Sequence, residues 1–321
     1  EATGKLTLDS GNDVLVRGAE LSAEQLEVLA GGSIRVDTIE IRRSYNMDGP
    51  ARNKLEMLTH LSADISSALD TLIRAEQDIV LAGAQLTGGT DVSLFAGNDL
   101  RMEAVQERYY SYLVQSSSSL TSSKKKITEH SGVEQIGTQI QAGGQLTLEA
   151  EEGEVAILAS TGHGEQGVTV NAGTDVRIES GIDTEYERTL IIKKNAARVK
   201  TTDKGSHAES LALAGLSSGA DLDINADGNM FMAGAALEAG DELRLGGVSV
   251  ATDETGSMLL DETGMPVVLS GGLNNIIIDT VALEDRSWNV TTRELRGPIK
   301  ALAELQNFVV DAMTLGISGA T

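Results

Sequence analysis

A short unit that recurs with a spacing of 21 residues is the feature that most limits how this chain can fold. The unit at Asp78–Leu86 has a polar turn residue, a short apolar stretch, a Gly-Ala pair and a second apolar position. Similar units stand at Asp13–Leu21 and Asn229–Leu237. Asp78 and Asp99 are 21 positions apart, and each opens such a stretch. Self-similarity at periods of this length is typical of repeat architectures, in which one unit stacks on the next.

Short alternating stretches recur within each period, beginning for example at Ile79, Val92 and Leu100. Alternation places every second side chain on one face of a strand. Three short strands and three turns in 21 residues predict one coil of a right-handed parallel β-helix, an all-β fold. Corners such as Gly97-Asn98-Asp99 indicate bends that need positive φ. One coil cannot bury its inner face alone, so the coils must stabilise one another.

Four segments interrupt the predicted coils. Residues 48–75 place leucine and isoleucine at spacings of three or four after Pro50, which predicts a helical insert. Residues 103–139 and 181–214 lose the coil pattern and alternate on either side of a polar tip, so we expect two-stranded arms. Residues 298–321 predict a C-terminal helix that caps the stack or links it onward. The β-helix itself is expected over residues 1–297.

Composition supports a thin aliphatic core and a secreted molecule. Aromatic residues make up 3% of the chain, and the net charge is -23. Such acidity keeps an extended surface soluble and argues against binding to nucleic acid. Cysteine is absent, which excludes disulfides and thiolate sites. No signal peptide and no apolar run of membrane-spanning length is present. Because the pattern is already under way at Glu1, we expect a longer parent chain.

The two arms are the best candidates for contact with a partner. They hold four of the five tyrosines, and their basic and acidic residues nearly balance, so the excess negative charge lies on the stem. Tyrosine offers a large contact area at low entropic cost. An equally weighted alternative is that the tyrosines pack the arms against the stem. The candidate binding residues are Tyr109, Tyr110, Tyr112, Lys124, Lys125, Lys126 and Tyr186.

Catalytic and metal sites are not predicted. The histidines His60, His130, His163 and His207 stand alone, and none belongs to a metal-binding motif. Parallel β-helices include polysaccharide lyases, and Asp221, Asp223 and Asp241 could meet on one face. Outward strand positions are ordinarily polar because water touches them, so this alternative is remote. We expect no catalytic residue, no cofactor and no metal.

The coil signature at Ala96–Leu100, the unit at Ala82–Leu86 and the Ser- and Lys-rich stretch at Ser116–Lys126 resemble filamentous hemagglutinin repeats of two-partner-secreted exoproteins. The likeness is greatest to the second repeat region of hemagglutinins and contact-dependent growth inhibition toxins. It spans nearly all of residues 1–295. The helical insert and the C-terminal helix depart from the family pattern.

This resemblance implies a non-catalytic stalk exported through an outer-membrane two-partner secretion transporter and displayed at the bacterial cell surface. In the toxin branch, the stalk presents or delivers a C-terminal toxin to a neighbouring cell, through that cell's surface or outer membrane. An immunity protein would belong to the parent toxin and not to this segment. The alternative is an adhesin segment that attaches to host cells or biofilm.

Overall fold

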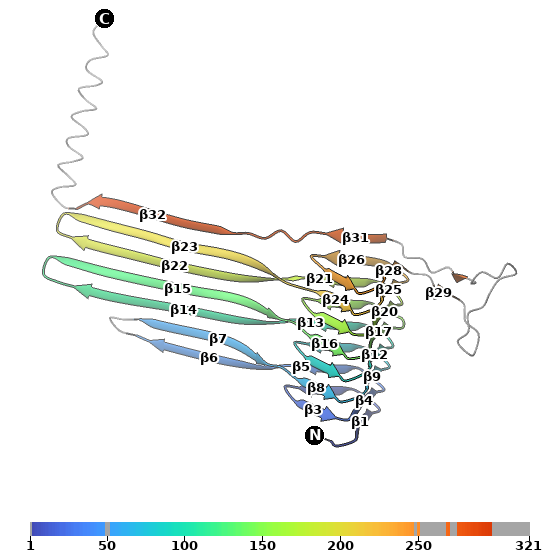
Figure 1. Cartoon of the computed structure of the whole chain (residues 1–321). Coiled ribbons are helices and arrows are strands. Elements are labelled where there is room, and N and C mark those ends of the chain that lie inside the picture. The colour runs from blue at the N-terminus through green and yellow to red at the C-terminus, as the bar shows by residue number, and fades with distance from the viewer. Residues whose placement is uncertain (1, 49–51, 247–248, 251–267, 270–274, 297–321) are drawn as a thin grey trace, which may run out of the picture.

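The computed structural model describes residues 2–48, 52–246, 249–250, 268–269 and 275–296. Within these residues the chain winds into a column of stacked coils, and a flat sheet of long strands projects from one side of the column (Figure 1). The predicted parallel β-helix is therefore confirmed, with three sheets as its walls. In the described part of the chain, no helix is long and apolar enough to cross a membrane.

Each wall of the column is a parallel sheet whose strands come from successive coils. The first wall contains β1 (Lys5–Ser10), β4 (Gln25–Ala30), β9 (Thr71–Ala75), β12 (Val92–Ala96), β17 (Gln145–Ala150), β20 (Gly167–Ala172), β25 (Leu222–Ala226) and β28 (Leu243–Gly246). The second wall contains β2 (Val14–Arg17), β5 (Ile34–Asp37), β10 (Ile79–Ala82), β13 (Leu100–Glu103), β18 (Val155–Leu158), β21 (Val176–Glu179), β26 (Asn229–Ala233) and β31 (Asn275–Asp279). The third wall contains β3 (Glu20–Ala23), β8 (Asp64–Ser67), β11 (Gln85–Gly88), β16 (Gln139–Ala142), β19 (Thr161–Gly164), β24 (Gly215–Ser218) and β27 (Ala236–Ala239).

The projecting sheet, which we call the hairpin sheet, is antiparallel throughout. It contains β6 (Ile39–Met47), β7 (Asn53–Leu61), β14 (Val105–Ser118), β15 (Ser122–Ile136), β22 (Gly181–Asn195), β23 (Arg198–Ala212) and β32 (Arg286–Leu295). Three hairpins, β6–β7, β14–β15 and β22–β23, leave the column between its second and third walls and return to it (Figure 1). A separate short antiparallel pair joins β29 (Ser249–Val250) to β30 (Val268–Leu269).

The register of the first wall explains the sequence period. Paired residues along this wall lie 20, 45, 21, 54, 22, 54 and 21 positions apart in the chain. A plain coil therefore takes 20 to 22 residues, as the spacing predicts, and every second coil carries a hairpin in addition. Ile79 pairs with Leu100, and Leu222 pairs with Leu243, each across the predicted 21 positions.

The core is a set of ladders of identical or similar side chains. Burial alternates along β4, where Leu26, Val28 and Ala30 point inward. The last inward position of this wall is alanine in six successive coils, at Ala30, Ala75, Ala96, Ala150, Ala172 and Ala226. The wall bends directly after this position, so only a small side chain fits the corner. This explains why an alanine recurs at the end of each first-wall strand, as in the Ala96-Gly97 pair.

Aspartates at the corners bind the next coil. The Asp91 carboxylate accepts a hydrogen bond from the backbone N–H of Gln145 at 2.8 Å, and the Asp175 carboxylate accepts one from Asn229 at 2.7 Å. A Cβ at Gly144 would collide with the Asp91 carboxylate. Part of the acidity of the stem therefore lies in residues that join its coils.

The expected positive φ at the corners following the first wall is wrong. Gly97 does not have positive φ, but a Cβ there would collide with the backbone of Glu76 in the preceding coil. Left-handed backbone with φ of 45° to 61° occurs instead between the second and third walls, at Gly18, Gly83 and Gly234, with Ala159 at the equivalent corner of another plain coil. Gly167, where β20 begins, has φ of 155°.

The predicted helical insert at 48–75 is also wrong. The helical spacing rests on Leu55, Leu58, Leu61, Ile65, Leu69 and Leu72. Of these six residues only Ile65 reaches the core, and the first two lie on the half-exposed hairpin strand β7. The true inward row continues through Ser67 and Thr71, whose hydroxyl groups hydrogen-bond each other at 2.8 Å inside the column. Because these inward residues are polar, the sequence hides the strand alternation there. The predicted C-terminal helix at 298–321 lies outside the described residues.

Candidate functional site

The hairpin sheet is the candidate site, because it holds the predicted binding residues away from the column. Strand alternation divides those residues between its two faces. Tyr109 lies on what we call the histidine face, together with His130. Tyr110, Tyr112 and Tyr186 lie on the opposite, tyrosine face. The three arm tyrosines that are adjacent in sequence therefore do not form one surface.

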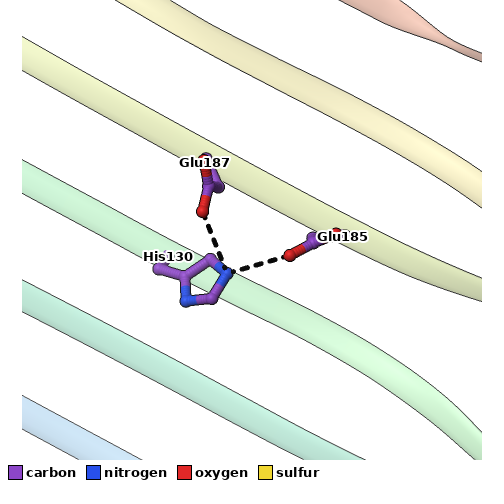
Figure 2. Close-up of side chains that lie close together, drawn as sticks. All are labelled: His130, Glu185 and Glu187. Atoms are coloured by element: carbon purple, nitrogen blue, oxygen red, sulfur yellow. Dashed lines mark hydrogen bonds and ion pairs between the residues drawn. The ribbon is translucent and has the colours of Figure 1, made fainter.

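On the histidine face, one imidazole lies among three oxygen atoms from two hairpins. The Nε2 atom of His130 on β15 is 3.3 Å from a carboxylate oxygen of Glu185 and 3.5 Å from one of Glu187, both on β22 (Figure 2). The Tyr109 hydroxyl, from β14, lies 3.2 Å from the same nitrogen. The structure thus gives neighbours to a histidine that looks isolated in the sequence.

The position of Tyr109 depends on a glycine. Gly132 is directly opposite Tyr109 in the β14–β15 pair, and a Cβ at Gly132 would collide with the tyrosine ring. The ring therefore lies across β15 and packs against His130, with ring centres 4.8 Å apart. Burial raises the pKa of Tyr109, and the charges of Glu185 and Glu187 raise it further.

The tyrosine face carries an open groove of about 730 Å³. Tyr110 and Tyr186 line it, with Arg108 and His207. The Tyr110 hydroxyl donates a hydrogen bond to Glu129 at 3.3 Å, and burial together with Glu129 raises its pKa. The Lys54 ammonium lies 5.5 Å from the centre of the Tyr110 ring, within range of a cation–π contact.

One carboxylate links the last three strands of the hairpin sheet, β22, β23 and β32. Arg188 on β22 donates to both carboxylate oxygens of Asp203 on β23, at 3.0 and 2.6 Å. The Trp288 indole N–H on β32 donates to the same carboxylate at 3.1 Å. The hydrogen bonds from Arg188 have the largest effect on the pKa of Asp203 and lower it, and the hydrogen bond from Trp288 lowers it further. The Asp203 carboxylate in turn raises the pKa of Arg188. The Trp288 ring also packs against Tyr186, with ring centres 5.9 Å apart.

The outer ends of the second hairpin, the third hairpin and the adjoining strand β32 are strongly cationic; we call these three ends the tips. Residues 115–126, 191–202 and 291–296 contain a single carboxylate, that of Glu294. Their cationic residues are Lys124, Lys125, Lys126, Lys193, Lys194, Arg198, Lys200, Arg293 and Arg296.

Four of these cations form a row straight across the sheet, which we call the cation row. Lys124 pairs with Lys193, Lys193 with Lys200, and Lys200 with Arg293. Direct opposition places all four on one face, and all four are exposed. Like charges directly opposite each other destabilise a sheet. No ion pair within 4 Å relieves any of the four within the part of the chain that the structure describes.

The predicted lysines take different positions relative to this row. Lys124 is its first member, Lys126 lies on the same face one step inward, and Lys125 lies on the opposite face. The sequence analysis missed Lys193, Lys200 and Arg293. Lys193 and Lys200 were visible as basic residues near the tip of the arm at 181–214, and Arg293 lies outside both arms. The register that aligns them with Lys124 depends on how the strands of the hairpin sheet pair.

Two of the three aspartates weighed as a lyase site, Asp221 and Asp223, are ion-paired with one arginine. Arg244 lies 3.5 Å from Asp221 and 3.2 Å from Asp223, so these carboxylates form an ion-pair network on an exposed wall. Hydrogen bonds to Glu242 and Asp223 raise the pKa of Arg244.

Comparison with known proteins gives consistent matches. The family model of the hemagglutinin repeat matches residues 1–51, 57–123 and 117–245. The chain is 24% identical over 243 residues to a protein named hemolysin of Proteus mirabilis, covering 75% of this chain and 15% of that protein. It is 28% identical over 182 residues to the tRNA nuclease CdiA of Escherichia coli (strain STEC_O31), covering 55% of this chain and 5% of that protein. The chain thus spans a small part of the relatives that it matches. No solved structure matches it.

Proposed function

This chain belongs to the hemagglutinin repeat family, and from that premise we propose that it is a non-catalytic stalk segment of a large secreted bacterial exoprotein. The hairpin sheet contacts the surface of a target cell, and the stalk presents or delivers a toxin carried elsewhere in the parent protein. The parent reaches the cell surface through a two-partner secretion transporter in the outer membrane. An immunity protein would recognise the toxin and not this segment.

The cation row carries this proposal. The chain has a net charge of -23, yet the outer ends of the second hairpin, the third hairpin and β32 carry nine cationic residues against one carboxylate. The tips lie at the far end of the hairpin sheet from the column (Figure 1). A negatively charged cell surface can therefore meet the tips without approaching the acidic stem. Complementary charge steers such encounters and speeds association at low salt.

The tip of the second hairpin adds an apolar residue. Leu120, in the turn between β14 and β15, is fully exposed, lies between Ser119 and Thr121, and is followed by Lys124–Lys126. Cationic side chains beside an exposed apolar group suit a phosphate-rich lipid surface, where the charges meet the phosphates and the apolar group enters the interface.

Binding of the 321-residue chain to target bacteria and to vesicles containing anionic phospholipid tests the proposal. We expect binding that weakens as salt rises from 50 to 500 mM, and that falls at least about tenfold in Lys193→Glu/Lys200→Glu. The matched control Arg17→Glu/Arg74→Glu makes the same charge change on the stem and should bind like the unchanged chain. Equal loss in both variants, or no loss in either, would contradict a role for the tips.

An adhesin segment is the second candidate, and the groove on the tyrosine face favours it. Tyrosine rings beside Arg108 and His207 offer stacking and hydrogen bonds to a host glycan. Attachment to host cells that is lost in Tyr186→Ala but kept in Lys193→Glu/Lys200→Glu would favour adhesion over contact with bacteria. Turnover of a polyuronate by the isolated chain would instead revive the remote lyase alternative.

A further inference from the structure

We propose that His130, Glu185 and Glu187 bind a zinc ion that clamps the second hairpin to the third. This inference concerns a different part of the hairpin sheet from the cation row, and it stands apart from the proposed function. It starts from an imbalance of donors and acceptors around one nitrogen atom.

The Nε2 atom of His130 can form one good hydrogen bond, but it faces three oxygen atoms. Their distances from it are 3.2 Å for Tyr109, 3.3 Å for Glu185 and 3.5 Å for Glu187. Ordinary N–H···O hydrogen bonds are about 2.7–3.2 Å long. Figure 2 shows the imidazole nitrogen facing both carboxylates at once. The donor atoms of the histidine and the two glutamates all lie within 4.8 Å of one another.

These distances match the edges of a tetrahedral zinc site. Zinc binds histidine nitrogen and carboxylate oxygen at about 2.0–2.2 Å, so ligand atoms at the corners of a tetrahedron lie about 3.3–3.5 Å apart. The distances of 3.3 and 3.5 Å from Nε2 to the Glu185 and Glu187 oxygens fall within this range. A nitrogen donor among oxygen donors favours zinc over calcium or magnesium, which prefer oxygen alone.

The electrostatic surroundings also suit a cation. Two carboxylates two residues apart on β22 point to the same side, and both are more than half exposed, so an ion can reach them from solvent. Gly132 leaves the space through which the Tyr109 ring reaches this point.

A second cluster, His207 with Glu209 and Glu284, is less suitable. The backbone N–H of Glu284 already donates to the Glu209 carboxylate at 2.7 Å, and Arg286 is the register partner of His207. The positive charge of the Arg286 guanidinium, opposite His207, repels a metal ion at this cluster.

The proposed ion would join β15 to β22, two neighbouring strands that belong to different hairpins. His130 belongs to the hairpin β14–β15, and the two glutamates belong to β22 of the next hairpin. A metal bound only by the folded state stabilises that state by an amount that grows with the logarithm of the free metal concentration relative to its dissociation constant. Zinc therefore should raise the stability of the hairpin sheet more than that of the column.

Titration of the 321-residue chain with zinc chloride by calorimetry, in 0.15 M salt with excess magnesium, tests the site. We expect one zinc ion per chain, bound at least about tenfold more weakly by His130→Ala and by the isosteric Glu185→Gln/Glu187→Gln. His163→Ala is the matched control, because His163 has one neighbouring carboxylate, Glu165, on the column at 3.3 Å. This variant and His207→Ala should bind zinc like the unchanged chain.

Zinc should also raise the melting temperature of the unchanged chain by several degrees, and not that of His130→Ala. Absence of saturable zinc binding would overturn the inference. So would equal zinc affinity of His130→Ala and the unchanged chain, or loss of binding in His163→Ala or His207→Ala.

Discussion

At the scale of single residues, the fold depends on a few positions that allow no side chain or only a small one. The corner between the second and third walls needs a left-handed backbone in each plain coil, with φ of 49°, 61°, 45° and 61° at Gly18, Gly83, Ala159 and Gly234. Glycine takes this conformation without steric cost, whereas an L-residue pays about 1–2 kcal/mol. The Gly-Ala pair of the repeat exists for this corner.

Gly83→Ala should destabilise the chain by about 2 kcal/mol. The added Cβ is strained by φ of 61° and would crowd the side chains of Val105 and Thr38. Chemical denaturation followed by circular dichroism measures the effect. Gly4→Ala, where nothing lies within 4 Å, should change the stability by less than about 0.5 kcal/mol. Equal effects at the two positions would refute the argument.

Ala159 offers the reverse test of the same argument. Among the residues that the structure describes, it is the one residue other than glycine with positive φ, which is 45°. Ala159→Gly should leave the stability unchanged or raise it by up to about 1 kcal/mol, since relief of strain offsets the greater entropy of the unfolded glycine. A loss of more than about 1 kcal/mol in the same denaturation experiment would mean that the Ala159 methyl group matters more than the backbone strain.

At the scale of strands, side chains that reach across register pairs hold the hairpin sheet together, because a sheet exposed on both faces has no deep core. Arg188 and Trp288 both donate to Asp203, so one carboxylate links β22, β23 and β32. Hydrogen bonds to a charged group are stronger than neutral ones and contribute about 1.5–3 kcal/mol each where buried. Because Asp203 is only partly buried, we expect each of its hydrogen bonds to contribute less than this range.

The Asp203 network predicts a defined loss of stability in acid. The folded state lowers the pKa of Asp203 below its ordinary value of 3.8, so the unfolded chain takes up the proton first as pH falls. The contribution of Asp203 is therefore complete above about pH 5 and is lost as pH falls through its folded pKa, below 3.8. Asp203→Asn should melt lower than the unchanged chain at pH 7, and the difference should shrink between pH 5 and pH 2. A difference in melting temperature that stays constant over this range would contradict it.

At the scale of the whole molecule, the two sheet systems match in spacing. Neighbouring strands lie about 4.8 Å apart in a sheet, so two stacked coils rise about 9.6 Å and the two strands of one hairpin cover the same distance. One hairpin for every second coil therefore makes a continuous hairpin sheet. A hairpin in every coil would overcrowd the sheet, and one in every third would leave a gap. The alternation of short and long intervals along the first wall is this rule expressed in residue numbers.

Removal of the third hairpin tests this separation of column and hairpin sheet. Replacing residues 181–214 by the Gly-Ala corner of the β10–β11 coil turns a 54-residue interval into a plain coil. The column should keep its strand content by circular dichroism, because the three walls and their ladders are unchanged. The hairpin β14–β15 loses its pairing along β22, so limited proteolysis should cut within residues 105–136 faster than in the unchanged chain. Collapse of the column would show that the hairpins are needed for the coils to stack.

The sequence by itself determined the column. Its period of 21, its inward aliphatic positions and its small residues at the corners are local requirements, and each coil repeats them, so they are readable without coordinates. It also located the two long arms and their excess of tyrosine and lysine. It failed at 48–75, because Ser67 and Thr71 occupy inward positions and satisfy each other, which removes the apolar alternation.

Only the tertiary structure decided which side chains meet on the hairpin sheet. His130 and Glu185 are separated by 55 positions, and Lys124 and Lys193 by 69, and nothing local joins them. They become neighbours because successive hairpins pair at one fixed register, and a shift of one residue would send every side chain to the other face. That register depends on the spacing of the coils beneath the hairpins, which is a property of the stack and not of any one repeat.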